Sequence, residues 1–144
     1  MLISSSGGHW VQLNRLVPAF SECDKVFVTT NSEYRSQVAY SEFHVTPDAT
    51  RWNKFKMLWM ATKMLVLLIK CRPDVVVTTG AAPGFFALFI AKKMGCKTVW
   101  IDSIANVDEM SLSGQKVRPH ADLWLTQWEH LARPEGPHFM GAVL

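Results

Sequence analysis

The feature that most constrains the fold is a regular alternation of short β-branched runs with segments of helical length. The runs at 26–30, 75–79 and 98–101 are rich in Val, Thr and Ile, as buried strands are. Between them, segments such as 8–20 and 52–71 carry apolar residues at helical spacing. Strands that alternate with helices form a parallel sheet with helices on both faces. The sequence therefore predicts an α/β, Rossmann-like fold.

The remaining segments extend the same pattern without a break. We expect further strands at the opening Met-Leu-Ile and over 43–46, 121–127 and 139–144, and further helices over 31–40 and 85–94. The chain has 144 residues, of which 49% are hydrophobic, so it can bury a core and is not disordered. No repeat or linker divides it, and residues 1–144 are expected to form a single domain.

A turn of Ser6, Gly7, Gly8 and His9 joins the first strand to the first helix. The glycines let the backbone turn sharply, and the amides at a helix N-terminus favour an anion. His9 stands at this helix N-terminus, where an imidazole can exchange a proton near neutral pH. The turn matches neither the dinucleotide fingerprint nor the P-loop. A tight turn with a capping histidine remains the alternative.

Two other loops follow strands that would end at the same edge of the sheet. Ligands of parallel sheets bind beyond the carboxyl ends of the strands, so loops at that edge form one constellation. The second loop is the glycine turn 80–84, and the third begins at Asp102, for which a strand-end cap is an equal alternative. The candidate substrate-binding residues are therefore Ser6, Gly7, Gly8, Gly80, Ala81, Gly84, Asp102 and Ser103, with His9 as the candidate catalytic residue.

The segment 52–71 predicts a long helix with a lysine stripe. Lys56, Lys63 and Lys70 are spaced by seven residues and fall on one side of a helix. Trp52 and Trp59 flank this stripe, a combination typical of a helix lying on a membrane surface. The opposite face is expected to pack on the sheet through Met57, Leu58, Ala61, Leu65 and Leu68. The apolar run is too short to span a bilayer. The alternative is a core helix whose lysines face water.

Charge and cysteine content exclude several function classes. The net charge of +3 suits contact with phosphate or anionic lipid but is too small to indicate nucleic acid. Cys23, Cys71 and Cys96 lack the spacing of metal ligands, so we expect no metal or cofactor and inert packing roles for the thiols. An odd, sparse set of cysteines indicates a reducing compartment. Met1 leads directly into the first strand, so no signal peptide is expected.

Six short blocks occur in a characteristic order along the whole chain. They are 5–9 (SSGGH), 72–76 (RPDVV) with 79–82 (TGAA), 102–107 (DSIANV), 112–114 (LSG), 119–123 (PHADL) and 127–128 (QW). This order resembles the membrane-side subunit of the split UDP-N-acetylglucosamine transferase of dolichol-linked asparagine glycosylation. It is also similar to the bacterial counterparts of that subunit in capsule and exopolysaccharide synthesis.

The resemblance implies the N-terminal half of a two-domain GT-B glycosyltransferase that works as a peripheral protein on the cytoplasmic face of the membrane. Its implied partners are a donor-binding GT-B C-terminal-type subunit, a polyprenyl-diphosphate-linked saccharide acceptor and the membrane surface. The loop of His9 would face the reaction centre. Family members often have Glu in place of Asp102 and Arg in place of Asn106. Eukaryotic members also have an N-terminal spanning helix, so membrane attachment here would fall to 52–71 or to the partner.

Two other functions remain open from the sequence. One is a non-catalytic membrane anchor that activates a separate transferase, and the other is an autonomous nucleotide-binding enzyme. The short chain argues against the autonomous enzyme, because the GT-B reaction needs an opposing domain. The tail 139–144 is expected to face that second domain.

Overall fold

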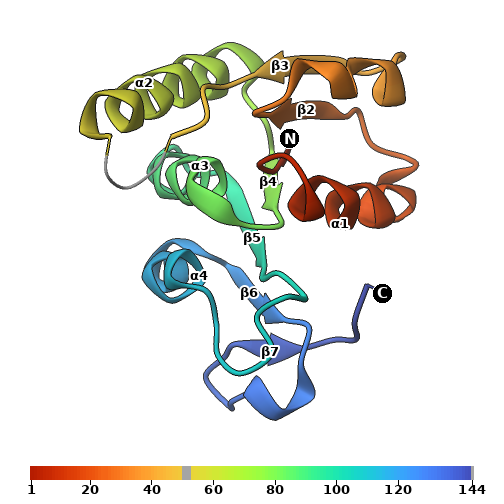
Figure 1. The fold of residues 1–144 in the computed structure, drawn as a ribbon, viewed down its shortest axis with the longest axis vertical. Helices are drawn as coiled ribbons and strands as arrows, with labels where there is room; N and C mark the ends of the chain where they lie inside the picture. The colour runs from red at the N-terminus through yellow and green to blue at the C-terminus, as the bar shows by residue number, and fades with distance from the viewer. Residues whose placement is uncertain (50–52, 144) are drawn as a thin grey trace.

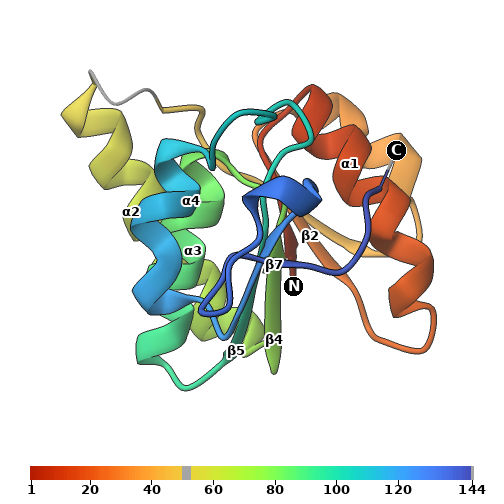
Figure 2. The same ribbon diagram turned by 90° about the horizontal axis from the view of Figure 1, so that it is seen from below.

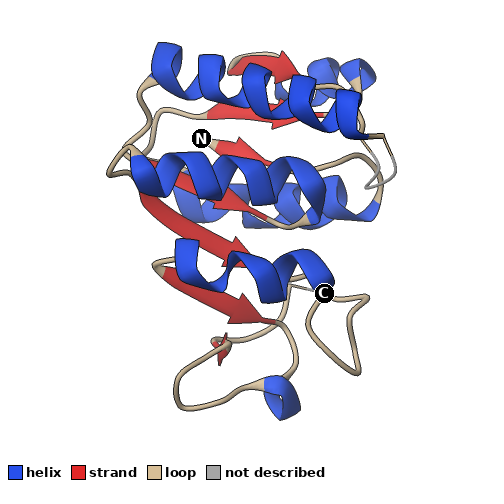
Figure 3. Cartoon of the chain, turned by 90° about the vertical axis from the view of Figure 1, so that its left-hand side faces the viewer, coloured by secondary structure: helices blue, strands red, loops and turns tan. Residues whose placement is uncertain are grey.

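One parallel sheet organises the computed structural model, which describes residues 1–49 and 53–143. Seven strands pair in the order β3-β2-β1-β4-β5-β6-β7, and every pair is parallel (Figure 3). The predicted parallel α/β sheet is confirmed. The strands are β1 Leu2–Ile3, β2 Val26–Thr29, β3 Glu42–Val45, β4 Val75–Thr78, β5 Lys97–Ile101, β6 Leu123–Thr126 and β7 His138–Phe139.

Helices cover both faces of this sheet. Helices α2, α3 and α4 lie on one side of it and α1 on the other (Figures 1 and 2). The α-helices are α1 Gly8–Leu16, α2 Lys54–Cys71, α3 Ala81–Lys93 and α4 Leu112–Val117. Short 3₁₀ helices complete the connections: η1 Val17–Phe20, η2 Ser32–Val38, η3 Arg118–His120 and η4 Glu129–Leu131.

The apolar core has one layer on each face of the sheet. Ile3 packs in the layer beneath α2 and α3 with Met64 and Leu88, whereas its neighbour Leu2 packs in the α1 layer with Trp10. Successive side chains of a strand point to opposite faces, so even the two-residue strand β1 supplies both layers. This central strand fixes where the chain enters the Ser6–His9 turn.

Most predicted boundaries are within two residues of the structure, and three predicted elements differ more clearly. The first helix does not run to Phe20, because Pro18 lacks an amide hydrogen and the chain continues as η1. The segment 31–40 forms the 3₁₀ helix η2, although Asn31 caps it as expected by accepting from the Glu33 amide at 2.9 Å. The last strand is β7, which begins at His138 and is shorter than the predicted 139–144.

The predicted glycine turn 80–84 is the fourth difference. Helix α3 begins at Ala81 rather than at Phe85, so Pro83 and Gly84 lie in its first turn. Proline is tolerated there because its missing amide hydrogen would have had no helical partner. Gly80 alone is the turn residue that precedes the helix.

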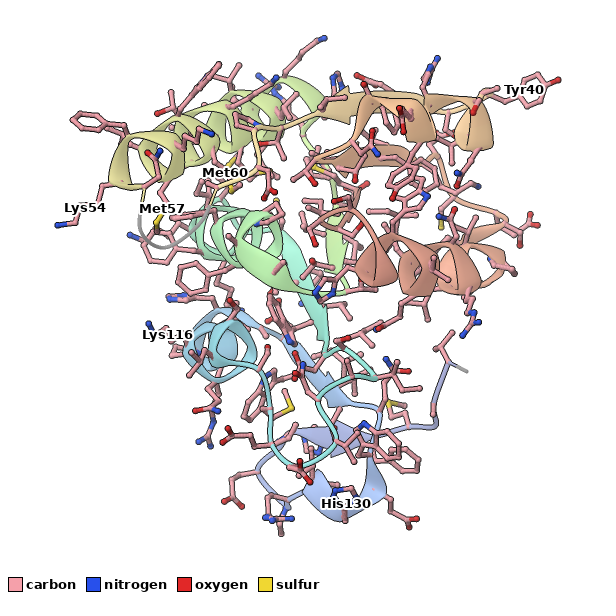
Figure 4. The ribbon with its side chains drawn as sticks, viewed as in Figure 1. Tyr40, Lys54, Met57, Met60, Lys116 and His130 are labelled. Carbon is pink, nitrogen blue, oxygen red and sulfur yellow. The ribbon has the colours of Figure 1, made fainter. Side chains whose placement is uncertain are left out.

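Helix α2 ends at Cys71 as expected, but it begins at Lys54 rather than at 52, and its buried face differs in part from the predicted one. Met60 and Leu67 are buried, and Met60 points from α2 toward α3 (Figure 4). Leu58 and Leu65, which were expected to pack on the sheet, are exposed. Leu68 is buried as predicted, and Met57 and Ala61 are half-buried. The prediction was wrong for Leu58 and Leu65 because α2 rests against α3, and the sequence does not show from which side that neighbour approaches.

Candidate functional site

His9 is held by two reciprocal hydrogen bonds to Thr79, across the sheet edge from its own loop. The imidazole Nδ1 lies 2.7 Å from the Thr79 carbonyl oxygen, and the Thr79 hydroxyl donates to the His9 carbonyl at 2.7 Å. A carbonyl oxygen only accepts, so this contact assigns the proton of the neutral ring to Nδ1. The contact therefore leaves Nε2 with a free lone pair. The two loops that the sequence predicted to meet at the carboxyl edge do meet there.

Gly80 makes room for this imidazole. Its φ of 124° lies in a region that side chains rarely adopt, and a Cβ built on it would lie 2.8 Å from His9 Cε1. Gly84 is equally confined, because its Cβ would lie 2.1 Å from the Thr78 hydroxyl oxygen. That hydroxyl accepts a hydrogen bond from the Gly80 amide at 3.1 Å. Both positions therefore require glycine, because the side chains of His9 and Thr78 leave no room for a Cβ there.

Ala81 carries backbone strain at the same point. Its φ is 63°, a left-handed conformation that costs an alanine on the order of 1 kcal/mol. Residues in such conformations concentrate at functional sites, where the surrounding structure holds them. Ala81 lies beside His9 in the lining of a pocket, so the strain is located at the candidate site.

The backbone amides of the first turn divide into two groups. The Ser6 amide donates to the Thr30 hydroxyl at 2.9 Å, and the Gly7 amide donates to the Tyr34 hydroxyl at 3.0 Å. Among the described residues, no acceptor engages the amides of Gly8 and His9. The amides of Gly8 and His9 are therefore the ones that remain available to an anion at this helix N-terminus. Thr30 and Tyr34 were not predicted, because they are distant in sequence and nothing local identifies them.

A pocket of about 430 Å³ opens beside His9. The loop between β5 and α4 forms much of its wall. Asp102 and Ser103 of this loop were both predicted to contact a ligand, and of the two Ser103 lines the pocket. Residues that the sequence had not singled out as a group also line it: the polar Asn106, Glu109, Ser111 and Ser113 and the apolar Ala105, Met110 and Leu112. The pocket thus combines one imidazole, one carboxylate and several hydroxyl or amide groups, a set suited to a polar ligand.

Asp102 organises the loop that forms this wall. It is buried, and its Oδ1 accepts from the Trp100 indole at 3.1 Å and from the Ser111 hydroxyl at 2.6 Å. Its Oδ2 accepts from the Asn106 amide group at 3.2 Å and from the Ser111 backbone amide at 2.7 Å. These contacts match the strand-end cap that the sequence left open as an alternative. Asp102 therefore acts on the pocket by fixing the loop 103–111.

Helix α2 exposes an apolar face outside the pocket, which we call the α2 apolar face. It consists of Phe55, Leu58, Trp59, Leu65, Val66 and Ile69, with exposed fractions between 41% and 87%. Lys56 and Lys70 are exposed along one border of this face, and Lys63 between them is half-buried. Trp52, also expected here, lies outside the described residues. None of the helices described is long and apolar enough to cross a membrane.

Comparison with known proteins finds relatives in sequence. The profile of a family described as "Oligosaccharide biosynthesis protein Alg14 like" matches residues 48–143. The UDP-N-acetylglucosamine transferase subunit ALG14 of Candida albicans is 36% identical over 72 residues, which cover 46% of this chain and 33% of that protein. The corresponding subunit of Schizosaccharomyces pombe is 36% identical over 67 residues, 42% of this chain and 31% of that protein. The chain thus matches about a third of the length of these relatives.

Comparison with solved structures finds the same fold. MurG of Acinetobacter baumannii superposes with a TM-score of 0.76 at 11% identity, over 98% of this chain and 45% of that one. A UDP-N-acetylglucosamine 2-epimerase superposes with a TM-score of 0.69 at 13% identity, over 88% and 41%. Both have the GT-B fold, and in each the match covers less than half of the chain. The present fold is therefore that of one half of a GT-B protein.

Proposed function

The chain belongs to the Alg14-like family of oligosaccharide biosynthesis proteins, and from this premise we propose that it is the acceptor-side subunit of a two-component UDP-N-acetylglucosamine transferase. The complex would transfer the sugar from the nucleotide to a polyprenyl-diphosphate-linked saccharide. The names of the relatives, transferase subunits, support this assignment. A role in bacterial capsule or exopolysaccharide synthesis remains a prediction from the sequence.

The names of the relatives support a donor-binding partner, because each is a subunit of a UDP-N-acetylglucosamine transferase. The fold described here matches 45% of MurG and 41% of the epimerase, as one half of a GT-B protein does. The proposed partner would supply the second half, of GT-B C-terminal type, and would hold the nucleotide sugar across the cleft from His9. Residues 1–144 are proposed to act as one domain of this complex.

The free Nε2 of His9 is the observation that carries the proposal. An acceptor hydroxyl must lose a proton as it attacks the anomeric carbon of the sugar, and Nε2 can take that proton. The Thr79 carbonyl, which accepts from Nδ1, would stabilise the imidazolium that forms. A phosphate contact is the second role open to this site, because the free amides of Gly8 and His9 favour an anion. In either role Ser103 and its loop would form the acceptor side of the pocket.

The α2 apolar face is the proposed membrane contact. Its aromatic and aliphatic side chains would enter the headgroup region while Lys56, Lys63 and Lys70 reach anionic headgroups. A helix that follows a strand of a parallel sheet begins at the carboxyl edge, so α2 begins at the same edge as the His9 pocket. A lipid-linked acceptor in that membrane would thereby lie near the pocket. We propose a peripheral, monotopic protein on the cytoplasmic face.

The test compares His9→Ala with wild type in a complex reconstituted with the donor-binding subunit. We expect turnover to fall by about 10² to 10⁴, the range for a positioned acid or base, with partner binding unchanged. A general base lost from the site lowers kcat at near-constant KM, whereas a lost phosphate contact raises KM. His138→Ala, an exposed histidine on β7, serves as the matched control. Wild-type turnover by His9→Ala would contradict both roles and leave a non-catalytic membrane anchor, which the α2 apolar face also suits.

A further inference from the structure

Three potential metal ligands converge on the far side of the molecule from His9. Glu42 and His44 are alternate residues of the edge strand β3, so their side chains lie on the same face of the sheet. Cys71 is the last residue of α2. His44 Nε2 lies 2.8 Å from Glu42 Oε1, and Cys71 Sγ lies 3.8 Å from that oxygen and 4.0 Å from that nitrogen.

We propose that Glu42, His44 and Cys71 form a zinc site that fastens the edge strand β3 to the C-terminal end of α2. Zinc bonds of ~2.0 to 2.3 Å in a tetrahedron place neighbouring ligand atoms about 3.4 to 3.6 Å apart. The observed separations bracket these values, so shifts of a few tenths of an ångström in exposed or half-buried side chains complete the triangle. Glu42 is exposed, which leaves the fourth position to water.

The ligand chemistry favours zinc over the common alternatives. A thiolate and an imidazole suit zinc, whereas magnesium and calcium take oxygen ligands. The Cys71 thiol would release its proton to the solvent as zinc binds, because the thiolate is the ligand form. Lys70 is a positive charge nearby, and its repulsion of a cation limits the affinity.

The position of the cluster indicates a structural role. Glu42 begins β3 and Cys71 ends α2, which places both at the amino edge of the parallel sheet, opposite the pocket. Among the strands described, β3 is at the edge of the sheet and pairs with β2, and α2 packs through one face. A metal bridge would tie this edge strand to the helix that follows it. The cysteine spacing predicted no metal site, and this cluster has no local signal because Cys71 is far from Glu42 and His44 along the chain.

Cobalt titration of the purified, metal-free chain tests the site. We expect one equivalent of Co²⁺ to bind with a thiolate-to-cobalt charge-transfer absorption in the near ultraviolet, and Zn²⁺ to abolish that absorption by displacement. Cys71→Ser should remove the absorption, and His44→Gln should weaken binding by more than about tenfold. Cys23→Ser removes an exposed thiol elsewhere in the chain and should change neither result.

A thermal measurement gives a second readout that does not depend on cobalt. Zn²⁺ should raise the Tm of the wild type and of Cys23→Ser, because a ligand that binds only the folded state stabilises it. It should leave the Tm of His44→Gln unchanged, and this variant keeps the thiol in case Cys71→Ser fails to fold. A wild-type chain without the charge-transfer band, or equal zinc stabilisation of wild type and His44→Gln, would show a hydrogen-bonded cluster only and overturn the proposal.

Discussion

At the scale of single residues, the candidate site depends on a histidine that fits only because a neighbouring position has no side chain. The His9 ring occupies the space that a Cβ at Gly80 would need, and Thr79 fixes the ring from the same loop. Gly80 and His9 are distant in sequence, so their fit is a tertiary feature. The orientation of Nε2 is therefore sensitive to atoms that make no contact with substrate.

We predict that Gly80→Ala displaces His9 and lowers the turnover of the reconstituted complex by at least about tenfold, because a base that moves out of line loses its proton-transfer geometry. Gly95→Ala is the matched control, since Gly95 also has a positive φ of 83° but nothing lies within 4 Å of its Cβ position. Both variants carry backbone strain, and only Gly80→Ala meets His9. Equal turnover in the two variants would mean that the position of His9 is unimportant.

The site residues near the glycine turns could be predicted because their chemistry is local. Glycines followed by a helix start indicate free amides, and a histidine in that place indicates proton exchange. Thr30, Tyr34 and Glu109 could not be predicted, because each reaches the site through the fold rather than through its neighbours in sequence. The role of Asp102 was left open for the same reason: its partner Ser111 lies nine residues further along.

At the scale of elements, α2 has one face buried in the core and a second, apolar face exposed to solvent. The existence of this helix follows from its periodicity, and its start is marked by Asn53, whose side chain accepts from the Lys56 amide at 2.9 Å. Its rotation about its own axis was mispredicted, because a helix that is apolar around most of its circumference has no sequence signal for which side is covered. The structure places Leu58 and Trp59 in solvent and Met64 in the core.

We predict that the chain binds vesicles containing anionic lipid and that salt weakens this binding through charge screening. Replacing Lys56, Lys63 and Lys70 together with Glu should release the protein, and Trp59→Ser should weaken binding at every salt concentration. The charge-matched control replaces Lys93, Lys97 and Lys116, which are exposed lysines outside α2. Vesicle sedimentation at several salt concentrations measures the binding of the wild type and of each variant. Equal loss of binding in the two triple variants would mean that net charge, rather than the α2 apolar face, determines the contact.

Asp122 directly precedes β6 and connects this strand to α3 and β5 at the amino edge of the sheet, opposite the His9 pocket. Its carboxylate pairs with Lys92 of α3 and accepts from the Thr98 amide of β5 at 2.9 Å. The hydrogen bond from Lys92 lowers the pKa of this carboxyl, so the folded state binds its proton less tightly than the unfolded chain does. The stabilisation is therefore complete above the ordinary Asp pKa and is lost as the pH falls through the lowered value.

We predict that Asp122→Asn lowers the free energy of unfolding at neutral pH by about 1 to 2 kcal/mol, because a charge-assisted contact and a partly exposed ion pair are weakened. The difference from wild type should shrink below about pH 4, where the carboxyl of the unfolded chain is protonated. Urea denaturation at several pH values measures this. A difference that does not change between neutral and acid pH would exclude the carboxylate as the cause.

At the scale of the whole molecule, the chain presents an exposed C-terminal segment that contacts α1 and the loop after β6. Met140 is 75% exposed after β7, and the tail then returns to the sheet edge, where the Val143 amide donates to Gln127 at 2.8 Å. Arg15 of α1 reaches the Val143 carbonyl at 3.4 Å. The tail is therefore anchored beyond Met140 and leaves an apolar side chain free to meet another protein.

We predict that the isolated chain shows no transferase activity and that Met140→Asp weakens co-purification with the donor-binding subunit by about tenfold or more, since a buried charge disfavours an interface. Tyr40→Asp is the control, because Tyr40 is fully exposed and points away from the molecule at its opposite end (Figure 4). Robust turnover by the chain alone would refute the two-component assignment. Full complex formation by Met140→Asp would show that the interface with the donor-binding subunit does not include Met140.

The single carboxylate that holds the pocket wall has a consequence for how this protein can be altered. Asp102 and Ser111 join the two ends of the loop 103–111. Between them, the backbone of Ile104 and Val107 bonds to Trp128 and His130, and Met110 packs in the core, so these positions also hold the loop against the domain. Ala105 and Glu109 line the pocket, and libraries at these two positions therefore offer a route to altering what the pocket accepts, with Asp102 and Ser111 kept as a permanent frame.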